Sequence, residues 1–488
     1  MKRCTGLVIA LLLFAITELS SSEIRSLWVL PWSLNTPAKI DQVIQDALRN
    51  GQNELLVEVR YRSDALYTQN RLSRKYPNPE YRSYILADPY FDPLAYALSE
   101  GHRFGLSVQA WVVVFNATPT AQQYLEQNYI YRNRRAWLSR ESGNGRSRAI
   151  DNYGYFIDPG VPEAQEHIKN VICDIASGYP GLDGIHLDYI RYPNASFGHH
   201  PVTLGRYYEY KRDHPETTWN DWRIKQVTSF VEALHAELDS IDPEILLTAA
   251  VFADYNEAVV QYAQEWRDWL DRGIVDKIYP MHYHKNDTAF LRILDDIDSF
   301  GHTDKIVMGI RAWDAGGGSL VPSENPSVLD YDIVNVLDRI NWIRDRAFSG
   351  IALFSYDGLI KGSGLDYLGQ RAYQPMTTQD LPPEILALFE DAATHHQAAD
   401  IAPDLFLTKR NGEYLLNMSL PWEGLWTIEI LDSREHLLWQ SSSSFMAGTN
   451  VVTINLPDSL GATDVLFFHL YRDVDKYKYI IPVSLENQ

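Results

Sequence analysis

The residues best suited to chemistry lie in the segment 182–193, which reads LDGIHLDYIRYP. The segment begins with an aspartate–glycine turn pair, continues through apolar residues and ends at a proline, as a short buried strand does. Because side chains alternate along a strand, His186 and Asp188 share one face, and Asp188 lies towards its carboxyl end. An aspartate in that position, beside Arg191 and Tyr192, has the chemistry of a carbohydrate-processing site. The structural alternative is an aspartate that caps a loop and pairs with Arg191.

Further polar and aromatic residues are predicted at the ends of other strands. They are Trp32, Glu58, Arg60, Trp111, Asn116, Asp254, His282, Tyr283, His284, Arg311, Trp313, Tyr356 and Asp357. Carboxylates and aromatic residues without a glycine-rich phosphate loop point to glycoside hydrolysis. In that reaction a protonated carboxylic acid assists the leaving group, and a carboxylate attacks the sugar or activates water. The side chains of this set that are not catalytic are expected to bind the substrate.

The catalytic carboxylates are predicted to be Asp188 and one partner. Asp188 is expected to be the charged member, because His186 and Arg191 nearby would favour its ionised form. Asp254, which follows the fifth predicted strand, is the first choice for the partner acid, with Glu58 and then Asp357 behind it. Glu58 alternates with Arg60 along its strand, so a buried ion pair between these two residues is an equally good interpretation of Glu58.

Metal chemistry is the main alternative. His282 and His284 are two residues apart on a predicted strand, a spacing that can present two imidazoles to zinc. The pair lacks an assigned third ligand, and histidines at a strand end can equally bind sugar hydroxyl groups. No metal and no other cofactor is therefore predicted. No G-x-S-x-G segment is present, and Cys173 lies within a helical apolar pattern, so a serine or cysteine nucleophile is not expected.

The elements that position these residues are short apolar strands alternating with helical segments. The predicted strands are 24–32, 54–61, 106–115, 184–190, 245–252, 274–284, 305–313 and 350–356. Eight such units predict an α/β fold of the (β/α)8 TIM-barrel type, in which catalytic side chains project at the carboxyl ends of the strands. The long irregular stretch 116–160 is rich in tyrosine, and loops of that length are often functional.

Three domains are predicted along the chain. Residues 1–22 have the positive start, apolar centre and small-residue end of a signal peptide. Residues 23–399 form the barrel, and residues 400–488 read as short strands of a small all-β sandwich of the fibronectin type III kind. The predicted export places the protein in a bacterial periplasm or outside the cell. After cleavage only Cys173 remains, so no intramolecular disulfide can form.

Composition narrows the possible partners. The 488-residue chain has 43 Lys and Arg against 64 Asp and Glu, and a formal charge of −21, which argues against nucleic-acid binding. Its 30 tyrosines and 13 tryptophans offer flat apolar faces with a polar edge, which suit stacking against sugar rings. No second apolar stretch long enough to span a membrane follows the signal segment. A glycan or polysaccharide is the expected partner.

At these residues the sequence resembles the glycosyl-hydrolase-like family ten, found in exported bacterial proteins, over residues 23–375. The matching segments are Leu27-Trp28, 58–60, 64–67, 90–94, 105–111, 158–163, 183–189 and 279–283. The resemblance implies a TIM barrel acting on glycans, with bacterial cell-wall strands or other polysaccharides as the substrate class, and it places Asp188 in the family's active-site strand. Many members carry a second aspartate after it, where this chain has Tyr189.

The sequence thus predicts an exported glycoside hydrolase that cleaves a polysaccharide or cell-wall glycan strand with Asp188 and a second carboxylate. A non-catalytic glycan-binding barrel that has lost its proton donor is an alternative of a different class. A metal-dependent hydrolase or deacetylase built on His282 and His284 is a third, weaker alternative.

Overall fold

The chain divides into two units, Met1–Gln379 and Asp380–Gln488, in a computed structural model. The structure describes residues 23–143, 145–150, 153–313, 332–360 and 364–373 of the first unit. In the second unit it describes residues 404–410, 413–420, 424–431, 437–445, 448–456, 465–472 and 477–484. The predicted signal peptide, residues 1–22, lies outside the described residues.

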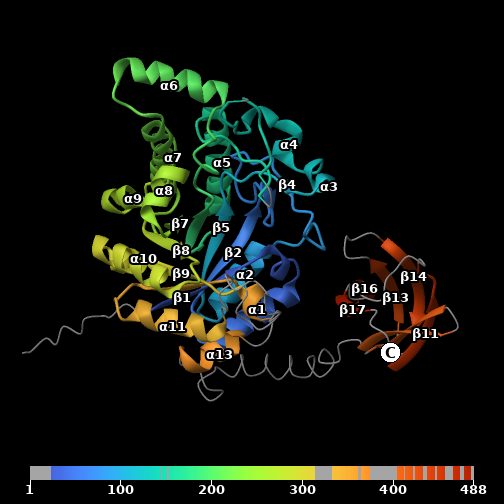
Figure 1. The fold of residues 1–488 in the computed structure, drawn as a ribbon. Coiled ribbons are helices and arrows are strands. Elements are labelled where there is room, and N and C mark those ends of the chain that lie inside the picture. Colours follow the sequence, from blue (N-terminus) through green and yellow to red (C-terminus); the bar gives the residue numbers. More distant parts are fainter. Residues whose placement is uncertain are drawn as a thin grey trace, which may run out of the picture. The chain divides into compact units, whose positions relative to one another are not determined.

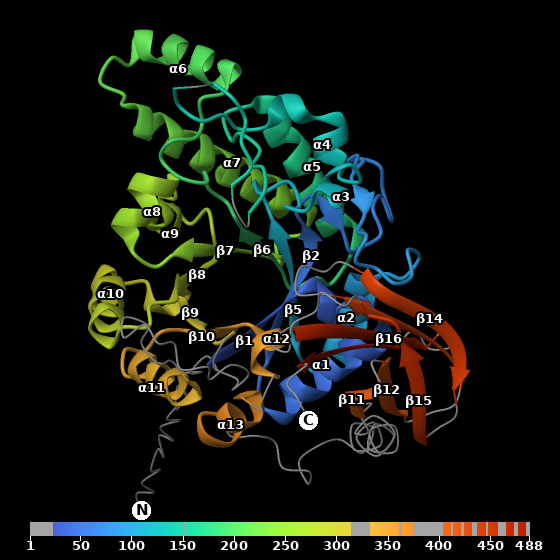
Figure 2. The same ribbon diagram turned by 45° about the vertical axis from the view of Figure 1, so that its right-hand side comes forward.

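Eight parallel strands form the centre of the first unit (Figure 1). They are β1 (Ile24–Val29), β2 (Glu54–Tyr61), β5 (Ser107–Val113), β6 (Gly184–Asp188), β7 (Leu246–Phe252), β8 (Lys277–His282), β9 (Val307–Arg311) and β10 (Gly350–Phe354). Each strand pairs with the next in chain order, and β10 pairs with β1, which closes the barrel. The predicted (β/α)8 barrel is confirmed. Figure 2 shows β1, β2 and β5 side by side, as their pairing requires.

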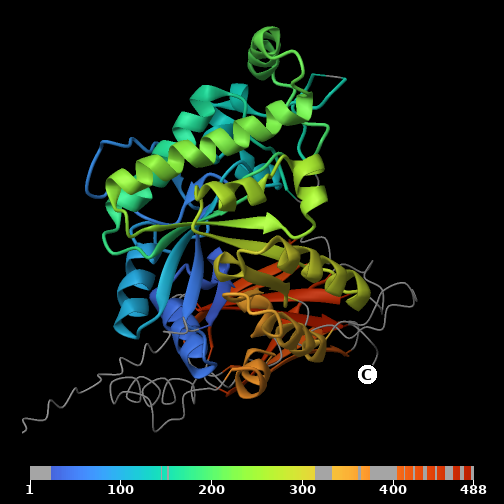
Figure 3. The same cartoon turned by 90° about the vertical axis from the view of Figure 1, so that its left-hand side faces the viewer.

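Helices surround the barrel strands. The longer ones are α1 (Pro37–Arg49), α2 (Pro93–Arg103), α5 (Pro162–Gly178), α6 (Pro201–Asp213), α7 (Trp219–Ile241), α10 (Asp287–Phe300) and α11 (Ile333–Arg344). The shorter ones are α3 (Gln122–Leu125), α4 (Tyr129–Asn133), α8 (Tyr255–Tyr262), α9 (Trp266–Arg272), α12 (Tyr356–Leu359) and α13 (Gly364–Arg371). The long helix α7 lies across the outside of the strands in Figure 3. Among the described helices, none combines the length and apolar character needed to cross a bilayer.

Short elements fill the loops around the barrel. They are the 3-10 turns η1 (Pro31–Ser33), η2 (Arg135–Trp137) and η3 (Thr303–Lys305) and the two-residue strands β3 (Asp64–Ala65) and β4 (Tyr81–Arg82). The strand β3 pairs with the end of β2 and extends the barrel sheet at that edge.

Local sequence explains why the barrel helices start where they do. Helix α1 begins at Pro37, whose fixed φ suits the first helical turn, and the Thr36 side chain accepts a hydrogen bond from the Lys39 backbone N–H. The buried side chains of α1 include Ile40 and Ala47, at the spacing of one helix face. The sequence therefore buries one stripe of the helix against the barrel.

The barrel interior is filled by large side chains from several strands. The apolar cluster consists of Trp28, Leu56, Trp111, Tyr279, Val307 and Ala352. Trp28 and Trp111 belong to this cluster and also reach the carboxyl ends of the strands, where they line a cavity. The same packing that closes the barrel therefore forms the floor of the candidate site.

The second unit contains only antiparallel strands among its described residues. One sheet has the order β11 (Asp404–Arg410), β12 (Glu413–Leu420), β15 (Gly448–Ile454), and the other β14 (Leu437–Phe445), β13 (Gly424–Leu431), β16 (Val465–Arg472), β17 (Tyr477–Ser484). Trp426, Ile428 and Ile430 alternate along β13 and share one core with Leu416 and Ile454 of the other sheet. Five of these strands match the strands that the sequence predicts at 414–419, 425–431, 450–454, 466–472 and 477–483. The sequence analysis missed β11 and β14, and likeness to fibronectin type III stays a prediction.

Candidate active site

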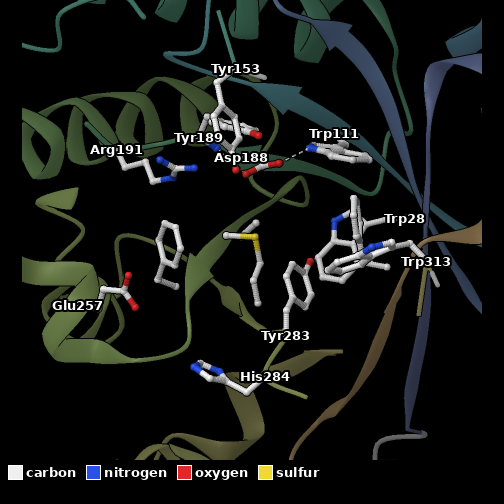
Figure 4. Close-up of a pocket in the computed structure, with 14 residues that line it drawn as sticks. Trp28, Trp111, Tyr153, Asp188, Tyr189, Arg191, Glu257, Tyr283, His284 and Trp313 are labelled. Carbon is white, nitrogen blue, oxygen red and sulfur yellow. Dashed lines mark hydrogen bonds between the residues drawn. The ribbon is translucent and has the colours of Figure 1, made fainter. Parts of the chain in front are cut away.

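A cavity of about 470 Å³ lies at the carboxyl ends of the barrel strands. Its volume falls within the roughly 300–1,000 Å³ usual for small-molecule sites. The lining residues are Trp28, Trp111, Tyr153, Asp188, Tyr189, Arg191, Ala250, Phe252, Glu257, Met281, Tyr283, His284, Trp313 and Phe354 (Figure 4). Phenylalanine, tyrosine and tryptophan make up more than half of this set, and Asp188 and Arg191 are its buried charged groups. Flat apolar walls with a buried carboxylate suit a sugar ring.

Asp188 is the last residue of β6 and projects into the cavity (Figure 4). The Trp111 indole Nε1 donates a hydrogen bond to Asp188 Oδ2 at 3.2 Å, and the Tyr189 backbone N–H donates to Oδ1 at 2.6 Å. Tyr189 has a φ of 51°, a left-handed conformation that non-glycine residues adopt rarely and that concentrates at functional sites. This turn places the Tyr189 ring against Phe156 and Tyr153 and beside the cavity.

Burial dominates the electrostatics of Asp188. It raises the pKa of the carboxyl above its usual value, while the Arg191 charge and the hydrogen bonds from Tyr189 and Trp111 oppose the shift without cancelling it. The predicted help from His186 is wrong, because burial lowers the pKa of His186 to about 3 and the ring is neutral. Of the two predicted cations, Arg191 alone therefore favours the ionised carboxylate.

Arg191 is fixed by aromatic faces. Its guanidinium carbon lies 4.6 Å from the ring centre of Tyr189, 4.8 Å from that of Phe252 and 5.0 Å from that of Tyr262. Its Nη1 donates to the Tyr192 carbonyl oxygen at 3.4 Å. Three aromatic rings thus hold the guanidinium in place beside the cavity.

Glu58 is a second buried carboxyl group on the interior side of the barrel. It lies two residues after Leu56, a member of the interior cluster, and stands opposite Trp111 of β5 in the register. Burial, followed by the negative charge of Asp188, raises the pKa of Glu58 well above its usual value. Glu58 does not belong to the cavity lining, but its charge and that of Asp188 act on each other. Of the two, Glu58 has the larger upward shift and keeps its proton to higher pH.

Arg60 does not share the face of Glu58. A β-bulge between the two residues breaks the alternation, so Arg60 stands opposite Val112, the neighbour of the interior residue Trp111. The Arg60 guanidinium instead binds Glu80, with Nε to Oε2 at 2.8 Å and Nη2 to Oε1 at 2.6 Å, and both side chains are fully buried. The predicted roles of Arg60, in substrate binding or in an ion pair with Glu58, are therefore wrong.

The Arg60–Glu80 pair gives a stability prediction. Burial raises the pKa of Glu80, but the Arg60 charge and the hydrogen bonds from His167 and Arg60 outweigh it and lower the pKa to about 2. Glu80→Gln leaves the Arg60 charge buried without compensation, so we expect the free energy of unfolding to fall by about 3–5 kcal/mol at neutral pH. Denaturant unfolding measures it, and Glu209→Ala, on the exposed side of α6, is the control.

The pH dependence of the same measurement checks the cause. The pKa of Glu80 is lower in the folded chain than its ordinary 4.5, so its contribution is complete above that value and disappears as the pH falls towards 2. The difference between wild type and Glu80→Gln should shrink over this window. A difference that stays constant down to pH 2 would contradict an electrostatic origin.

His186 lies beneath the cavity in a chain of buried hydrogen bonds. Trp28 Nε1 can only donate, so His186 Nε2 accepts its bond at 3.1 Å, and His186 Nδ1–H donates to Thr248 Oγ1 at 2.8 Å. Thr248 donates to Gln109 Oε1 at 2.7 Å, and Gln109 Nε2 donates to Glu54 Oε2 at 2.7 Å. The chain fixes the tautomer of His186 and ties Trp28 to the barrel floor. His186 therefore positions a cavity wall and does not line the cavity itself.

Asp254, the first choice for the partner acid, lies outside the cavity. It is the N-cap of α8, where its Oδ1 accepts from the Glu257 backbone N–H at 3.1 Å, and its Oδ2 is 3.4 Å from Arg292. Aspartate is a preferred N-cap residue, which explains its position after the strand. The role of Asp254 as the partner acid stays a prediction that this position does not favour, and Glu257, one turn into the helix, lies at the cavity instead.

The side chains of Tyr356 and Asp357 form hydrogen bonds with neighbouring elements. The strand β10 ends at Phe354, which lines the cavity, and the Tyr356 hydroxyl donates to Asp46 of α1 at 2.9 Å. Asp357 accepts from the Leu30 backbone N–H at 3.1 Å and from the Ser33 hydroxyl at 2.6 Å. Asp357 therefore holds the turn that follows β1, and its charge also raises the pKa of Glu58.

His282 and His284 are placed differently. His282 is buried, stacks on Phe290 with ring centres 3.9 Å apart and has its Nε2 2.8 Å from the Phe290 carbonyl oxygen. Burial lowers the pKa of His282 to about 3. His284 lines the cavity, and its Nδ1 is 3.4 Å from that of His282. Within the described part of the chain, no three histidine, cysteine, aspartate or glutamate side chains are arranged to hold a metal ion.

The remaining predicted residues fall into two groups. Trp111, Asp188, Arg191, Tyr283 and Trp313 line the cavity. Trp32, Asn116, Tyr192 and Arg311 are not part of its lining. Asn116 is buried and pairs through its backbone with Phe156, Tyr192 is buried under the Arg223 guanidinium, and the Arg311 guanidinium lies 3.9 Å from the Trp313 ring centre.

The sequence analysis missed several cavity residues. They are Trp28, Tyr153, Tyr189, Ala250, Phe252, Glu257, Met281 and Phe354. Tyr153 could have been predicted, because it lies in the long tyrosine-rich stretch that was expected to be functional. Trp28 and Phe354 could also have been predicted, because each is on the interior face of a predicted strand. Glu257 lies in a helix, where alternation along a strand says nothing about direction.

Comparison with known proteins places this site in a family context. Residues 23–308 match the family described as Glycosyl hydrolase-like 10. The chain is 24% identical to glycosyl hydrolase YngK of Bacillus subtilis (strain 168) over 294 residues, which are 54% of each protein. It is also 24% identical to glycosyl hydrolase DigH of Escherichia coli (strain K12) over 315 residues, 55% of this chain and 67% of that protein. The matched region thus spans about half the length of YngK.

The fold has a counterpart among solved structures. The glycoside hydrolase domain of PgaB (BpsB) from Bordetella bronchiseptica superimposes with a TM-score of 0.51 at 11% sequence identity, over 71% of this chain and 98% of that domain. At this identity the likeness concerns the fold alone. Because the family match covers more than half of the sequence, including β6 and the Asp188 strand end, this chain belongs to the Glycosyl hydrolase-like 10 family.

Proposed function

We propose that this protein is a glycoside hydrolase that cleaves glycosidic bonds in a polysaccharide or cell-wall glycan strand, with Glu58 as the acid and Asp188 as the charged carboxylate. The observation that carries the proposal is the pair itself. Two buried carboxyl groups at the carboxyl end of a barrel act on each other, and the pKa of Glu58 is raised further than that of Asp188. Such a separation between two neighbouring carboxyl groups assigns the acid and base roles.

The reaction follows from these protonation states. The Glu58 carboxylic acid donates its proton to the glycosidic oxygen as the bond to the anomeric carbon breaks, so the leaving sugar departs with a neutral hydroxyl group. The Asp188 carboxylate either bonds to the anomeric carbon or takes a proton from a water molecule that attacks it. In the first case water then releases the sugar from Asp188 and returns a proton to Glu58.

The cavity walls support the same chemistry. The positive charge that develops on the sugar ring in the transition state lies beside the Asp188 carboxylate, which Trp111 and the Tyr189 N–H hold in place. The Tyr283 hydroxyl points into the cavity in Figure 4, and burial together with the Asp188 charge raises its pKa well above the usual value. Tyr283 therefore stays protonated and can donate a hydrogen bond to the substrate.

The proposed substrate class and location are linked. The predicted signal peptide would deliver the enzyme to the bacterial periplasm or the cell exterior, where cell-wall strands and secreted polysaccharides are found. Relatives of similar sequence carry the name glycosyl hydrolase, which supports a glycan substrate. The net charge of −21 favours a substrate that is not a polyanion.

Product analysis tests the proposal. The purified protein is incubated with a panel of glycans that includes peptidoglycan strands and N-acetylglucosamine oligomers, and the products are sized by mass spectrometry. We expect shorter saccharides from at least one glycan. Proton NMR of the first products then gives the anomeric configuration and decides whether Asp188 attacks the sugar or activates water.

A second candidate function is a non-catalytic glycan-binding barrel. The observation in its favour is Tyr189, which occupies the position where many family members are expected to carry a second aspartate. Binding of a glycan without any shortening, measured by calorimetry on the same panel, would favour this candidate over the hydrolase.

A further inference from the structure

We propose that Trp32 is a stacking subsite for the leaving-group side of a glycan chain, across the carboxylate pair from the cavity. This inference rests on the proposed function and states in which direction the glycan chain lies across the site. The sugar whose anomeric carbon reacts occupies the cavity, and the sugar that departs extends over Trp32. The substrate is then a chain with sugars on both sides of the cleaved bond.

The barrel topology separates the two sides. Most of the cavity lining comes from the ends of β6 to β10 and the loops that follow them. Glu58 lies on β2, and Trp32 follows β1, the direct neighbour of β2 in the closed barrel. Trp28 and Trp111, the cavity residues from β1 and β5, lie on the two strands that flank β2. Glu58 and Trp32 therefore belong to the same half of the barrel mouth.

Trp32 is exposed and its backbone is fixed. It is 48% exposed, in a chain where the other tryptophans named in the barrel interior are almost fully buried. The turn that carries it is held at both ends by Asp357, which accepts from the Leu30 N–H and the Ser33 hydroxyl. Lys39 Nζ donates to the Trp32 carbonyl oxygen at 2.8 Å. A large aromatic ring held in solvent on a fixed turn is preorganised for a ligand.

Tyr61 connects Trp32 to the acid. Its ring meets the Trp32 ring nearly at a right angle, at 71°, with ring centres 5.4 Å apart, and the Arg62 guanidinium lies 4.9 Å from the Tyr61 ring centre. Burial raises the pKa of Tyr61 to about 12, with the Arg62 charge opposing the shift and the Glu58 charge adding to it. Tyr61 therefore lies on the same strand as Glu58 and packs against Trp32 at the rim of the barrel.

The chemistry of the acid assigns this side of the barrel mouth to the leaving group. A general acid must lie beside the oxygen that it protonates, and that oxygen stays with the departing sugar. A departing sugar next to Glu58 lies on the half of the barrel mouth that carries Trp32. The face of an indole ring suits the apolar C–H side of a pyranose.

Trp32→Ala tests the assignment, with Tyr208→Ala as the matched control because Tyr208 is a 64% exposed aromatic residue on α6. Two substrates are compared for each variant: N-acetylglucosamine oligomers, or whichever oligosaccharides the wild type shortens, and an aryl glycoside of the sugar that occupies the cavity. We expect kcat/KM of Trp32→Ala to fall about 10- to 100-fold on the oligosaccharides, the range of a lost aromatic anchor. The aryl glycoside has no departing sugar, so its hydrolysis should not change.

A binding measurement separates the possible failures. Calorimetry with the same oligosaccharides is done on Asp188→Asn, with and without Trp32→Ala. Weaker binding only for oligosaccharides that extend past the cleaved bond supports the subsite. Equal loss on both substrates, or no loss on either, overturns the Trp32 assignment while the hydrolase proposal stands. A wild type that shortens no glycan overturns the proposed function, and the subsite assignment with it.

Discussion

Asp188→Asn is expected to lower kcat by about 10²–10⁴-fold or more on any glycan that the wild type shortens. The amide keeps the shape of the side chain but cannot carry the negative charge that faces the anomeric carbon. It also keeps only one oxygen for two donors, the Trp111 indole and the Tyr189 backbone N–H. Initial rates of saccharide release, measured side by side with the wild type, give the effect.

Two controls make this result specific. Burial raises the pKa of Asp188, so the ionised carboxylate costs folding free energy, and the neutral amide should leave the melting temperature near or above that of the wild type. Asp254→Asn removes the other aspartate that sequence analysis favoured, and we expect it to keep its activity because Asp254 caps α8 outside the cavity. A loss of activity in Asp254→Asn but not in Asp188→Asn would reverse the assignment.

The barrel could be predicted because each strand has a recognisable pattern in its local sequence. Short apolar segments such as 54–61 and 350–354 alternate with amphipathic helices, and handedness and closure then leave few topologies. The place of Asp188 at the end of its strand was predicted in the same way, from the alternation along a short apolar segment. Trp111 followed from the same alternation. The C-terminal strand β14 was missed because its serine run 441–444 hides the alternation.

The predictions of side-chain position fail where a contact with a residue distant in the sequence, and not the alternation along the strand, decides where the side chain lies. The bulge in β2 turns Arg60 towards Glu80, a residue twenty positions further along, and no local pattern reveals that partner. His186 shares a face with Asp188, as predicted, but lies one layer deeper, where Trp28 and Thr248 use both its nitrogens. A sequence shows which side of a strand a residue occupies, but not how deep in the barrel it lies.

The proposal that Glu58 is the acid needed the structure for a different reason. A pKa depends on how much solvent is removed from a group and on which charges stay close to it, and both follow from packing. Glu58, Asp254 and Asp357 are all carboxylates after predicted strands. Only the structure shows that Asp254 is a helix cap, that Asp357 holds a turn and that Glu58 is buried within the influence of Asp188.

Glu58→Gln should therefore have an effect of similar size but of a different kind. Without a proton to give, we expect kcat/KM on a natural glycan to fall about 10²–10⁴-fold. An aryl glycoside with a good leaving group needs little protonation, so its first bond cleavage should be largely retained. Glu209→Gln, which changes an exposed carboxylate on α6 outside the cavity, is the matched control and should leave both activities close to those of the wild type.

The pH profile gives an independent check. Activity requires ionised Asp188 and protonated Glu58, so the wild-type profile should rise through the pKa of Asp188 and fall through the higher pKa of Glu58. Glu58→Gln should lose the alkaline limb and keep the acidic one. If Glu58→Gln keeps both limbs of the profile and loses activity equally on the natural glycan and on the aryl glycoside, Glu58 is a positioning residue. Another residue is then the general acid.

Stability should move in the opposite direction from activity. The pKa of Glu58 is higher in the folded chain than its ordinary 4.5, so the folded state holds a proton that the unfolded state gives up once the pH exceeds that value. Folding free energy is then lost as the pH rises from 4.5 towards the folded pKa. Glu58→Gln carries no such cost, so it should be more stable than the wild type at neutral pH and equal to it below about pH 4. A buried acid that destabilises the fold while it accelerates a reaction is what a catalytic role predicts, because a structural role would give the reverse sign.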